Sequence, residues 1–582
     1  MDESTNLFEW KDMITNSFIF VRDKLNIHLK VNTMKHHLVV NLFVILLFFS
    51  QFGTAQVVTS WETSADKAKL FQKHSKLNFV DGTGKNGTKI YIDENTKYQK
   101  IEGFGWALTE GSAEVISQLS AERRKALLNE LFNRQTGIGS EVIRISLGAS
   151  DLSNSSYSYH EYPEDRSLSK FSLEGPDLTY LIPVLQEIVA INPDIKIIAT
   201  PWSPPKWMKT SNSYIGGELK EYDIYAKYFI KYFEAMKEQG INIWAITPQN
   251  EPHHPHNEPS MYMTKEQQVD FINRYLGPAI ANSEFKHVKI IAWDHNCDNT
   301  EYPIYVCNNS SYVDGSAFHL YGGDISAMSQ TYQATGKPVY FTEQYTGINT
   351  PFHEDFQWHM QSVMLGSVNN WSSLTLEWNL AANAKLEPHT PGGCDTCLGA
   401  LTVDGSTVTR NVSYYLVAQM SKVIKNGAYR IKSSGNDDQL KYASFLNSDG
   451  SVALVVHNGA GSTKTFDIVW EGKVITYTLT GGTTASLTWG EGEVPSVNES
   501  LARSQKGYNI YPNPTDGYLN IDISEGNELF SQLYSMSGEL LCSQYVTGLL
   551  NQINLSGMAD GLYFLKLQNQ KEVVYSQVIK RK

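Results

Sequence analysis

Cysteine is scarce in this chain of 582 residues, and the few cysteines are poorly placed for metal or redox chemistry. Cys394 and Cys397 form a Cys-x-x-Cys pair, but no second close ligand pair is evident with which to hold zinc. No thioredoxin-like unit surrounds them either. A local disulfide or two free structural thiols are the interpretations that remain, since a chain that leaves the cytoplasm can oxidise its thiols. The other cysteines are Cys297, Cys307 and Cys542.

Positive charge is also in deficit. The 48 lysines and arginines face 61 aspartates and glutamates, which gives a net charge of −13, and no Lys/Arg-rich run stands out. Nucleic-acid binding needs a basic footprint, so the sequence predicts no nucleic-acid partner. An acidic surface also argues against strong attachment to anionic lipid. No phosphate-binding loop is evident, and the sequence implies no cofactor.

Three histidines, His253, His254 and His256, lie close together and raise the question of a metal. Metal-binding histidines on a helix stand four residues apart, on one face. The His-His-Pro-His segment lacks that spacing. We therefore expect an exposed loop or a wall of a substrate cleft here, and no metal site.

The most apolar run, residues 38–49 (LVVNLFVILLFF), is too short for a membrane span, which needs ~20 residues. Basic residues precede it, and the small residues 53–55 after it suit signal peptidase. We expect a signal peptide over residues 34–55, beginning at Met34. Residues 1–33 are then an upstream extension.

What the sequence does have is a long alternation of apolar runs and helical stretches. Alternation with mostly apolar strands indicates a parallel sheet covered by helices. Eight repeats favour closure into an α/β fold, a (β/α)8 TIM barrel, which we expect over residues 98–427. Helical stretches include Ala121–Asn133, Leu178–Ile191 and Tyr222–Gln239. The predicted strands are residues 101–108, 141–148, 195–200, 241–247, 288–293, 315–321, 338–343 and 373–378.

Short strand-like runs flank the barrel on both sides. Residues 56–97 and residues 428–490 alternate strands with turns, and we expect them to join in one β-sandwich domain. Residues 491–507 are polar and predict a linker. The last segment, residues 508–582, returns to short strands and turns and predicts a small all-β domain.

Two glutamates stand at the ends of predicted strands. Glu251 follows the run INIWAIT, and Glu343 ends the run PVYFTE. Active sites of parallel β/α barrels lie at the carboxyl ends of the strands, so both carboxylates are expected on one face. Two carboxylates facing one glycosidic bond are the minimum for glycoside hydrolysis. We therefore take Glu251 and Glu343 as the candidate catalytic pair.

The two carboxylates are expected to differ in geometry and in charge from an ordinary surface pair. A retaining enzyme needs its two carboxyls about 5–5.5 Å apart. Repulsion between them is expected to raise the pKa of one, with Glu251 protonated. Hydrogen bonds are expected to keep the pKa of Glu343 low, so that it stays ionised.

Polar or aromatic side chains follow most of the other predicted strands as well. Asn250 directly precedes Glu251 and could hydrogen-bond a sugar 2-hydroxyl. The proline-stiffened segment TPWSPPKW presents Trp202 and Trp207. Sugar C–H faces pack on such rings. Further candidates at strand ends are Arg144, Asp151, His319, Tyr321 and Trp378.

The order and spacing of these motifs are specific. They are IEGFG (101–105), IRISLGASD (143–151), TPWSPPKWMKT (200–210), QNEP (249–252), HLY (319–321), TEQ (342–344) and EWNLA (377–381). Together they resemble glycoside hydrolase family 30, the glucosylceramidase-like retaining β-glycosidases. The resemblance implies that Glu251 is the acid/base and Glu343 the nucleophile. It also implies sugar contacts from Asp151, Trp202, Asn250 and Trp378, and support of the nucleophile by Arg144, His319 and Tyr321.

The chain departs from the family pattern at two positions. Trp106 stands where the family often has a second glycine, and we expect it to narrow or line the cleft. Pro248 stands where a β-branched residue is usual. Trp106 leaves the identity of the leaving-group sugar or lipid open.

The tail carries a second resemblance. YPNPTDGYLNI (511–521), GLYFLKL (561–567) and the basic end of the chain resemble the C-terminal sorting domain of type IX secretion. That likeness implies the type IX secretion machinery as a partner. It also implies export, with either attachment to the cell surface or release.

The favoured function is a secreted retaining β-glycoside hydrolase that cleaves β-glucosidic bonds, glucosylceramidase-like in type. An endo-β-1,6-glucanase of the same family is the alternative within this class. The substrate is then a β-linked glucoside, oligosaccharide or glycolipid. A non-catalytic carbohydrate-binding surface protein is the alternative from another class, but it would be expected to have one of the two glutamates replaced.

Overall fold

The computed structural model of the protein describes residues 57–490, except 75, 76 and 174, and residues 508–581, except 512, 524–527, 536–539, 548–550 and 569–572. The expected upstream extension, signal peptide and linker lie outside the described residues. One compact unit holds the barrel and nearly all the flanking strands, and a second holds the C-terminal domain. None of the described helices is long and apolar enough to cross a membrane.

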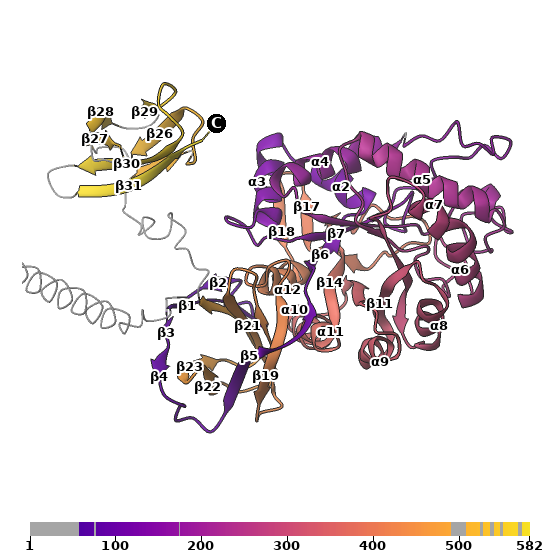
Figure 1. Ribbon diagram of the computed structural model, residues 1–582, viewed down its shortest axis with the longest axis horizontal. Helices are drawn as coiled ribbons and strands as arrows, with labels where there is room; N and C mark the ends of the chain where they lie inside the picture. The colour runs from indigo at the N-terminus through magenta and orange to yellow at the C-terminus, as the bar shows by residue number, and fades with distance from the viewer. Residues whose placement is uncertain are drawn as a thin grey trace, which may run out of the picture. The chain divides into compact units, whose positions relative to one another are not determined.

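Parallel strands close into a barrel in the order β10-β11-β12-β14-β6-β7-β8-β9, which confirms the predicted TIM barrel. Figure 1 shows helices such as α5, α6 and α8 outside the barrel strands β7 and β11. Each predicted strand contributes to the barrel. In chain order the barrel strands are β6 (Gly103–Ala107), β7 (Val142–Ser146), β8 (Lys196–Thr200), β9 (Ala245–Ile246), β10 (Lys289–Cys297), β11 (Val313–Gly323), β12 (Val339–Glu343) and β14 (Ser372–Asn379).

Strand β9 is much shorter than the predicted run 241–247. The residues on either side of β9 still pair with β8: the Trp244 N–H donates to the Ile197 carbonyl, and the Thr247 N–H donates to the Ala199 carbonyl. Pro248 comes next and has no N–H to extend the ladder. Pro248, which replaces the β-branched residue usual in the family, therefore ends the strand shortly before Glu251.

Helices follow the strands and cover the outside of the barrel. Side-chain caps fix several of their first turns: Thr109 caps α2, Ser120 caps α3, and Thr264 with Gln267 forms a capping box on α6. The α-helices are α2 (Glu110–Ser117), α3 (Ala121–Phe132), α4 (Ile182–Ile191), α5 (Tyr222–Glu238), α6 (Lys265–Phe271), α7 (Gly277–Ala281), α8 (Glu301–Asn309), α9 (Ser326–Thr335), α10 (Phe352–Trp358), α11 (Leu365–Asn369) and α12 (Val412–Ser421).

Several helices begin or continue as a different helix type. The predicted helix 178–191 divides into the π-helix η1 (Asp177–Leu181) and α4, where Pro183 lies in the first turn and cannot donate a backbone hydrogen bond. The other such segments are the 3₁₀-helix η2 (Lys206–Met208) and the π-helices η3 (Ile272–Leu276) and η4 (His359–Met364).

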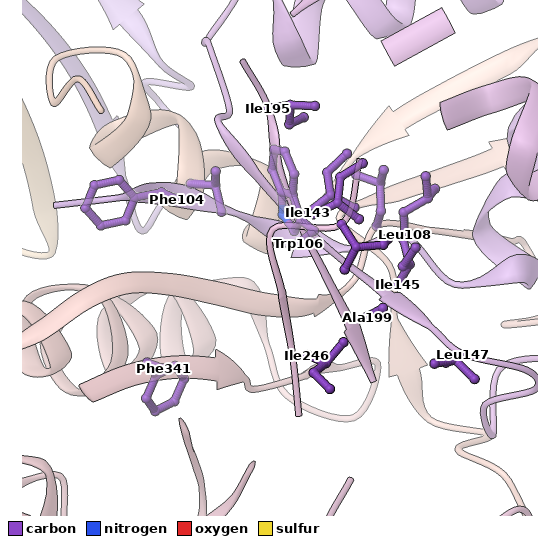
Figure 2. Close-up of a cluster of buried hydrophobic side chains, with 14 of the residues drawn as sticks. Phe104, Trp106, Leu108, Ile143, Ile145, Leu147, Ile195, Ala199, Ile246 and Phe341 are labelled. Atoms are coloured by element: carbon purple, nitrogen blue, oxygen red, sulfur yellow. The ribbon is translucent and has the colours of Figure 1, made fainter. Parts of the chain in front are cut away.

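Apolar side chains fill both faces of the barrel strands. The interior cluster includes Val142, Ile198 and Tyr340. Residues that alternate with these point outward and join a much larger cluster with the helices. Figure 2 shows part of this larger cluster, including Ile143 and Ile145 of β7.

Trp106 belongs to this outer cluster and does not line the cleft. Its side chain is 1% exposed, and its indole N–H donates to Ser413 Oγ of α12 at 3.0 Å. Figure 2 places it among the apolar side chains of β6 and β7. Because successive residues of a strand face opposite sides, a tryptophan at this position packs on the helix layer. The expectation that Trp106 narrows the cleft was wrong.

Strands from before and after the barrel join in one eleven-stranded sheet. β5 pairs antiparallel with β19 and parallel with β22. The Tyr477 hydroxyl of β23 donates to Glu62 of β1 at 2.7 Å, although these strands are far apart in the sheet order, so the sheet folds back as the predicted β-sandwich. Its strands are β1 (Val57–Ser64), β2 (Gln72–Lys73), β3 (Leu77–Asn78), β4 (Val80–Asp81), β5 (Lys89–Lys100), β19 (Tyr429–Gly435), β20 (Leu440–Leu446), β21 (Ser451–Asn458), β22 (Lys464–Trp470), β23 (Lys473–Leu479) and β24 (Thr483–Gly490).

Short strand pairs lie beyond the carboxyl ends of the barrel strands. β13 (Thr346–Gly347), which follows β12, pairs with β16 (Cys397–Leu398). β15 (Ala381–Asn383), which follows β14, pairs with β17 (Leu401–Asp404), and β17 pairs with β18 (Thr407–Arg410).

The C-terminal domain is all-β, as predicted. One sheet has the order β25-β26-β29 and the other has the order β28-β27-β30-β31. Leu519, Leu565 and Val578 contribute to its core. Its strands are β25 (Tyr508–Tyr511), β26 (Tyr518–Ile523), β27 (Glu528–Tyr534), β28 (Leu540–Thr547), β29 (Asn551–Asn554), β30 (Gly561–Gln568) and β31 (Val573–Lys580).

Candidate active site

Glu251 and Glu343 lie together at the carboxyl end of the barrel. Glu343 is the last residue of β12, and Glu251 lies in the segment that follows β9. Their side chains are only 12% and 8% exposed, respectively. Both carboxyls are therefore in a setting where neighbouring charges act through little water.

One ring nitrogen lies between the two carboxylates. His319 Nδ1 is 2.9 Å from Glu251 Oε1 and 3.7 Å from Glu343 Oε1. The two oxygens can be no farther apart than the sum of these distances. That bound lets both oxygens reach one bound sugar; it includes the ~5–5.5 Å of retaining pairs and extends to the ~6.5 Å of the narrowest inverting pairs.

Glu343 is held from both of its oxygens. Arg144 Nη1 donates to Oε2 at 2.6 Å, and the Tyr321 hydroxyl donates to Oε1 at 3.1 Å. Arg144 comes from the interior face of β7, and its side chain is fully buried. Bonds of this kind to a carboxylate are strong and directional, so they fix the Glu343 rotamer and favour its ionised form.

Asp294 organises the residues beneath the two glutamates. Its Oδ2 accepts from Arg144 Nη2 at 2.9 Å and from the Thr247 hydroxyl at 2.6 Å. Its Oδ1 accepts from the Thr342 hydroxyl at 2.6 Å and lies 3.2 Å from His319 Nε2. A fully buried carboxylate needs such partners, because an unpaired buried charge is strongly destabilising.

The backbone at Glu251 is unusual. Its φ of +44° is left-handed, a conformation that non-glycine residues rarely adopt. The Glu251 N–H donates to the Asp294 carbonyl at 3.0 Å, which helps to hold it there. The preceding Asn250 accepts a bond from Arg144 Nη2 at 2.7 Å. Strained residues that are held in this way concentrate at active sites.

The charges on the three central residues follow from these contacts. Burial alone would lower the pKa of His319, but the carboxylates of Glu343, Asp294 and Glu251 raise it to about 9. Burial alone would raise the pKa of Glu251, but the neighbouring imidazoles of His295, 3.4 Å away, and His319, at hydrogen-bond distance, outweigh burial and lower it. Burial raises the pKa of Glu343 against the attraction of His319 and Arg144. In the resting site the proton is therefore on His319.

This result reverses the order expected from the sequence, which had the pKa of Glu251 raised and that of Glu343 kept low. The reason is that a protonated imidazole, His319, faces Glu251 at hydrogen-bond distance. The sequence places His319 near the nucleophile but cannot show which carboxylate it contacts more closely.

Two tryptophans lie beside Arg144 and form an aromatic surface that is largely buried, since Trp202 is 2% and Trp378 3% exposed. The rings of Trp202 and Trp378 are 5.3 Å apart, and the Arg144 guanidinium lies 4.8 Å and 5.6 Å from their centres. Asp151 is nearby, since burial and the charge of Glu343 raise its pKa to about 7, while Asn257 hydrogen-bonds its side chain. Rings and a carboxyl in this arrangement suit the C–H face and hydroxyls of a sugar.

The histidine loop takes no part in this cluster. His254 and His256 are exposed, and His253 lies against the Tyr262 ring. Among the described residues, Glu251, His295 and His319 do bring three possible metal ligands within 4.8 Å of one another. Both nitrogens of His319 face carboxylates, however, which is how a protonated imidazole binds.

Of the side chains that the sequence predicts for the site, Trp207 lies elsewhere: it belongs to the outer cluster, and its indole N–H donates to the His160 carbonyl at 2.9 Å. The others lie in this cluster. What the sequence analysis missed is the layer beneath it: Asp294, His295 and the hydroxyls of Thr247 and Thr342. A usable signal did exist, because Asp294 and His295 directly follow the predicted strand 288–293. Glu377, in contrast, faces outward from β14 and pairs with His359 of η4 at 3.0 Å.

Comparison with known proteins accounts for both compact units. The model of the glycosyl hydrolase family 30 TIM-barrel domain matches residues 101–424, and that of the family 30 beta sandwich domain matches residues 427–487. A secretion system C-terminal sorting domain matches residues 509–581. This sorting domain indicates export by type IX secretion, to the cell surface or the medium.

Comparison with individual proteins also points to this family. An endo-1,6-beta-D-glucanase of Neurospora crassa is 33% identical over 431 residues, covering 69% of this chain and 88% of that protein. The lysosomal acid glucosylceramidase of Mus musculus is 28% identical over 412 residues, covering 64% and 77%. The solved structure of the endo-beta1,6-glucanase BT3312 has a TM-score of 0.71 at 33% identity and covers 75% of this chain and 99% of that one.

The likeness therefore extends through barrel and sandwich, over more than half of the chain and most of the length of its relatives. It coincides with a carboxylate pair at the end of the barrel where such enzymes act. The chain belongs to glycosyl hydrolase family 30 and is an exported glycoside hydrolase.

Proposed function

We propose that the protein hydrolyses β-glucosidic bonds with retention of configuration, with Glu343 as the nucleophile and Glu251 as the acid/base. The convergence of both carboxylates on His319 Nδ1 carries the proposal. The roles follow from their different partners. Glu343 is fixed by the permanent cation of Arg144, which suits an ionised nucleophile, whereas Glu251 contacts the His319 imidazole, which can exchange a proton with it.

The reaction proceeds in two displacements. Glu343 attacks the anomeric carbon while Glu251 gives a proton to the departing oxygen, which leaves a covalent glycosyl-enzyme ester. Glu251 then takes a proton from water, and that water attacks the same carbon and releases Glu343. Two inversions give net retention.

The proton for the first step comes to Glu251 from His319. In the resting site the imidazole holds it, 2.9 Å from Glu251 Oε1. As the leaving oxygen gains charge beside Glu251, the proton crosses that hydrogen bond. In the second step the proton that Glu251 takes from water crosses back to His319, which restores the resting site. Asp294 on the far nitrogen keeps His319 oriented throughout, in the manner of a carboxylate behind a catalytic histidine.

The substrate that we propose is a β-1,6-linked glucan. Two of the similar proteins, one a curated relative and one a solved structure, are described as endo-1,6-β-glucanases at 33% identity. An exported enzyme also meets extracellular polysaccharide. The Trp202–Trp378 surface lies beside Arg144, which binds the proposed nucleophile, and is the aromatic element that we assign to a glucose unit.

Glucosylceramide is the second candidate, because the similarity to the mouse glucosylceramidase covers 77% of that protein. It carries the same β-glucosyl unit on a lipid alcohol. A shared catalytic centre would cleave both, so the part of the site beyond the anomeric bond decides between them.

The purified enzyme should be given an aryl β-glucoside, β-1,6-glucan and glucosylceramide in detergent micelles, with the Glu343→Ala protein as the blank. We expect release from the aryl glucoside and early formation of mixed oligosaccharides from the glucan. Glucose alone from the glucan would indicate exo action. Ceramide released faster than glucan is cleaved would favour the second candidate, and no hydrolysis of any substrate would refute both.

A further inference from the structure

A loop of residues 388–398, here called the disulfide loop, lies between β15 and β17 and is closed by the Cys394–Cys397 disulfide. Of the two interpretations that the sequence leaves open, the disulfide is therefore the one found, while Cys297 and Cys307 are free and buried. Nothing in the proposed reaction uses this loop, yet it contacts several segments that carry site residues.

One end of the loop lies against Asp151. The Thr390 N–H donates to the Asp151 carbonyl at 2.8 Å, and the Thr390 hydroxyl donates to the Glu258 carbonyl at 2.6 Å. A Cβ placed on Gly393 would come within 2.2 Å of the Asp151 carbonyl oxygen. The loop backbone thus lies directly on the backbone of a proposed sugar contact, with no space between them.

The other end is joined to the segment after the proposed nucleophile. Cys397 and Leu398 form β16 and pair with Gly347 and Thr346 of β13. The Thr346 hydroxyl also donates to the Leu398 carbonyl at 3.1 Å. Only two residues separate Glu343 from this strand pair, so the loop joins the two sides of the site.

The disulfide itself lies behind the aromatic surface. Cys397 is buried in one cluster with Trp202 and Trp378, and Cys394 and Tyr345 pack against that cluster. The rings that face Arg144 therefore share one packed cluster with the disulfide. A covalent link at this place restricts how far the rings and the loop can move apart.

The disulfide joins cysteines only three positions apart. Short closed loops gain little from a crosslink, because the unfolded chain loses little freedom when they close. The main effect of this bond is thus on local geometry, and its effect on the overall free energy of unfolding is small.

We propose that the Cys394–Cys397 disulfide is a positioning element of the sugar site, which sets substrate affinity by holding the Trp202–Trp378 surface and Asp151 in register. The inference rests on the proposed function. Asp294 and Asn250 hold Arg144, and Arg144 in turn holds Glu343, so the chemical step does not depend on the loop. Loss of the disulfide should therefore weaken binding and leave turnover largely intact.

The test is the Cys394→Ala/Cys397→Ala double variant, assayed on β-1,6-glucan and on an aryl β-glucoside. We expect KM to rise about tenfold with kcat within about threefold, the pattern of lost uniform binding. Reduction of the native protein by a phosphine, verified by alkylation and mass, should produce the same KM without any change of side chain. Cys307→Ala, which removes a buried free thiol outside the site, is the control and should keep the native KM.

A second variant leaves the bond intact. Gly393→Ala should push the loop from Asp151 and also raise KM. An unchanged KM in the double variant and in the reduced protein would overturn the inference. A fall in kcat and Tm at native KM would also overturn it, because that result is expected of a disulfide that only stabilises the fold. A native enzyme inactive on both substrates would instead refute the proposed function.

Discussion

The charges around the His319 imidazole determine whether His319 or Glu251 holds the proton that they share. The groups that face this ring are Glu251, Glu343, Asp294, His295 and Tyr321. Three carboxylates outweigh the cost of burial and favour imidazolium, which then stabilises the Glu251 anion. An acid with a low pKa of its own can still deliver a proton if its neighbour supplies one.

This arrangement predicts that kcat/KM has a bell-shaped dependence on pH, in which His319 determines the basic limb and Glu343 the acid limb. As pH rises through the His319 pKa of about 9, the proton is lost and the acid step fails. As pH falls, Glu343 takes up a proton and can no longer attack. His319→Gln should lower kcat/KM and move the basic limb to lower pH, because Glu251 must then hold the proton itself. The measurement is kcat/KM against pH on a substrate with a poor leaving group.

Tyr321→Phe is the matched contrast, since it removes one bond to Glu343 and leaves the imidazole in place. It should raise the pKa of Glu343 and move the acid limb instead. A basic limb that His319→Gln leaves unchanged would show that the proton does not pass through His319.

The two glutamates can be told apart by rescue with azide. Glu343→Ala cannot form the covalent ester and should lose nearly all activity. Azide in the vacated space should attack an activated β-glucoside from the nucleophile's side and give the α-glycosyl azide. In Glu251→Ala, azide should intercept the glycosyl-enzyme from the other face and give the β-azide. Product stereochemistry, read by NMR, decides, and a β-azide from Glu343→Ala would mean that the roles are reversed.

Among elements, β10 determines the centre of the site. Trp293 and Asp294 have φ values of 73° and 63°, and the pairing with β11 shifts register there. This bulge turns Asp294 into the barrel, where it meets Arg144, Thr247 and His319. Bulges often redirect a side chain next to an active site.

Asp294→Asn tests the charge at this bulge, because asparagine also tolerates left-handed backbone. The variant should lose about 100-fold in kcat, since Arg144 and His319 both lose an anionic partner. Thr247→Val removes one hydroxyl donor to Asp294 with little change in side-chain shape, and it should lower kcat far less. Steady-state kinetics and thermal unfolding of both variants are the measurements. Near-native kcat in Asp294→Asn would show that hydrogen bonding alone, without charge, organises the site.

The element scale also shows what the sequence could and could not predict. Apolar runs and their spacing identified the barrel strands, because a buried parallel strand has to be apolar throughout. The same pattern identified Glu251 and Glu343 by position. Asp294 directly follows a predicted strand too, but the pattern did not show that it enters the barrel, because the bulge that turns it inward depends on backbone dihedrals that hydrophobicity does not encode. The pattern misplaced Trp106, because a fully apolar strand does not show which residues face inward.

At the scale of the whole molecule, the N-terminal strands are part of the catalytic unit, whereas the C-terminal sorting domain is a unit of its own. β5 precedes the barrel in sequence but lies between β19 and β22, which follow it. Gln99 of β5 also donates to the carbonyls of Val368 and Ser372, which belong to the barrel unit. The sorting domain belongs to a separate compact unit.

Two truncations should therefore behave in opposite ways. A chain that ends at residue 490 keeps every described strand of barrel and sandwich, and we expect native kcat/KM and Tm with loss of type IX export. A chain that lacks residues 57–100 loses β1 to β5, including the pairings of β5 with β19 and β22 and the buried Ile90. Total stability is only about 5–15 kcal/mol, so this loss should leave the protein insoluble or unfolded. Circular dichroism and activity of both chains test this. An inactive chain ending at residue 490 would show that the sorting domain supports the catalytic unit directly.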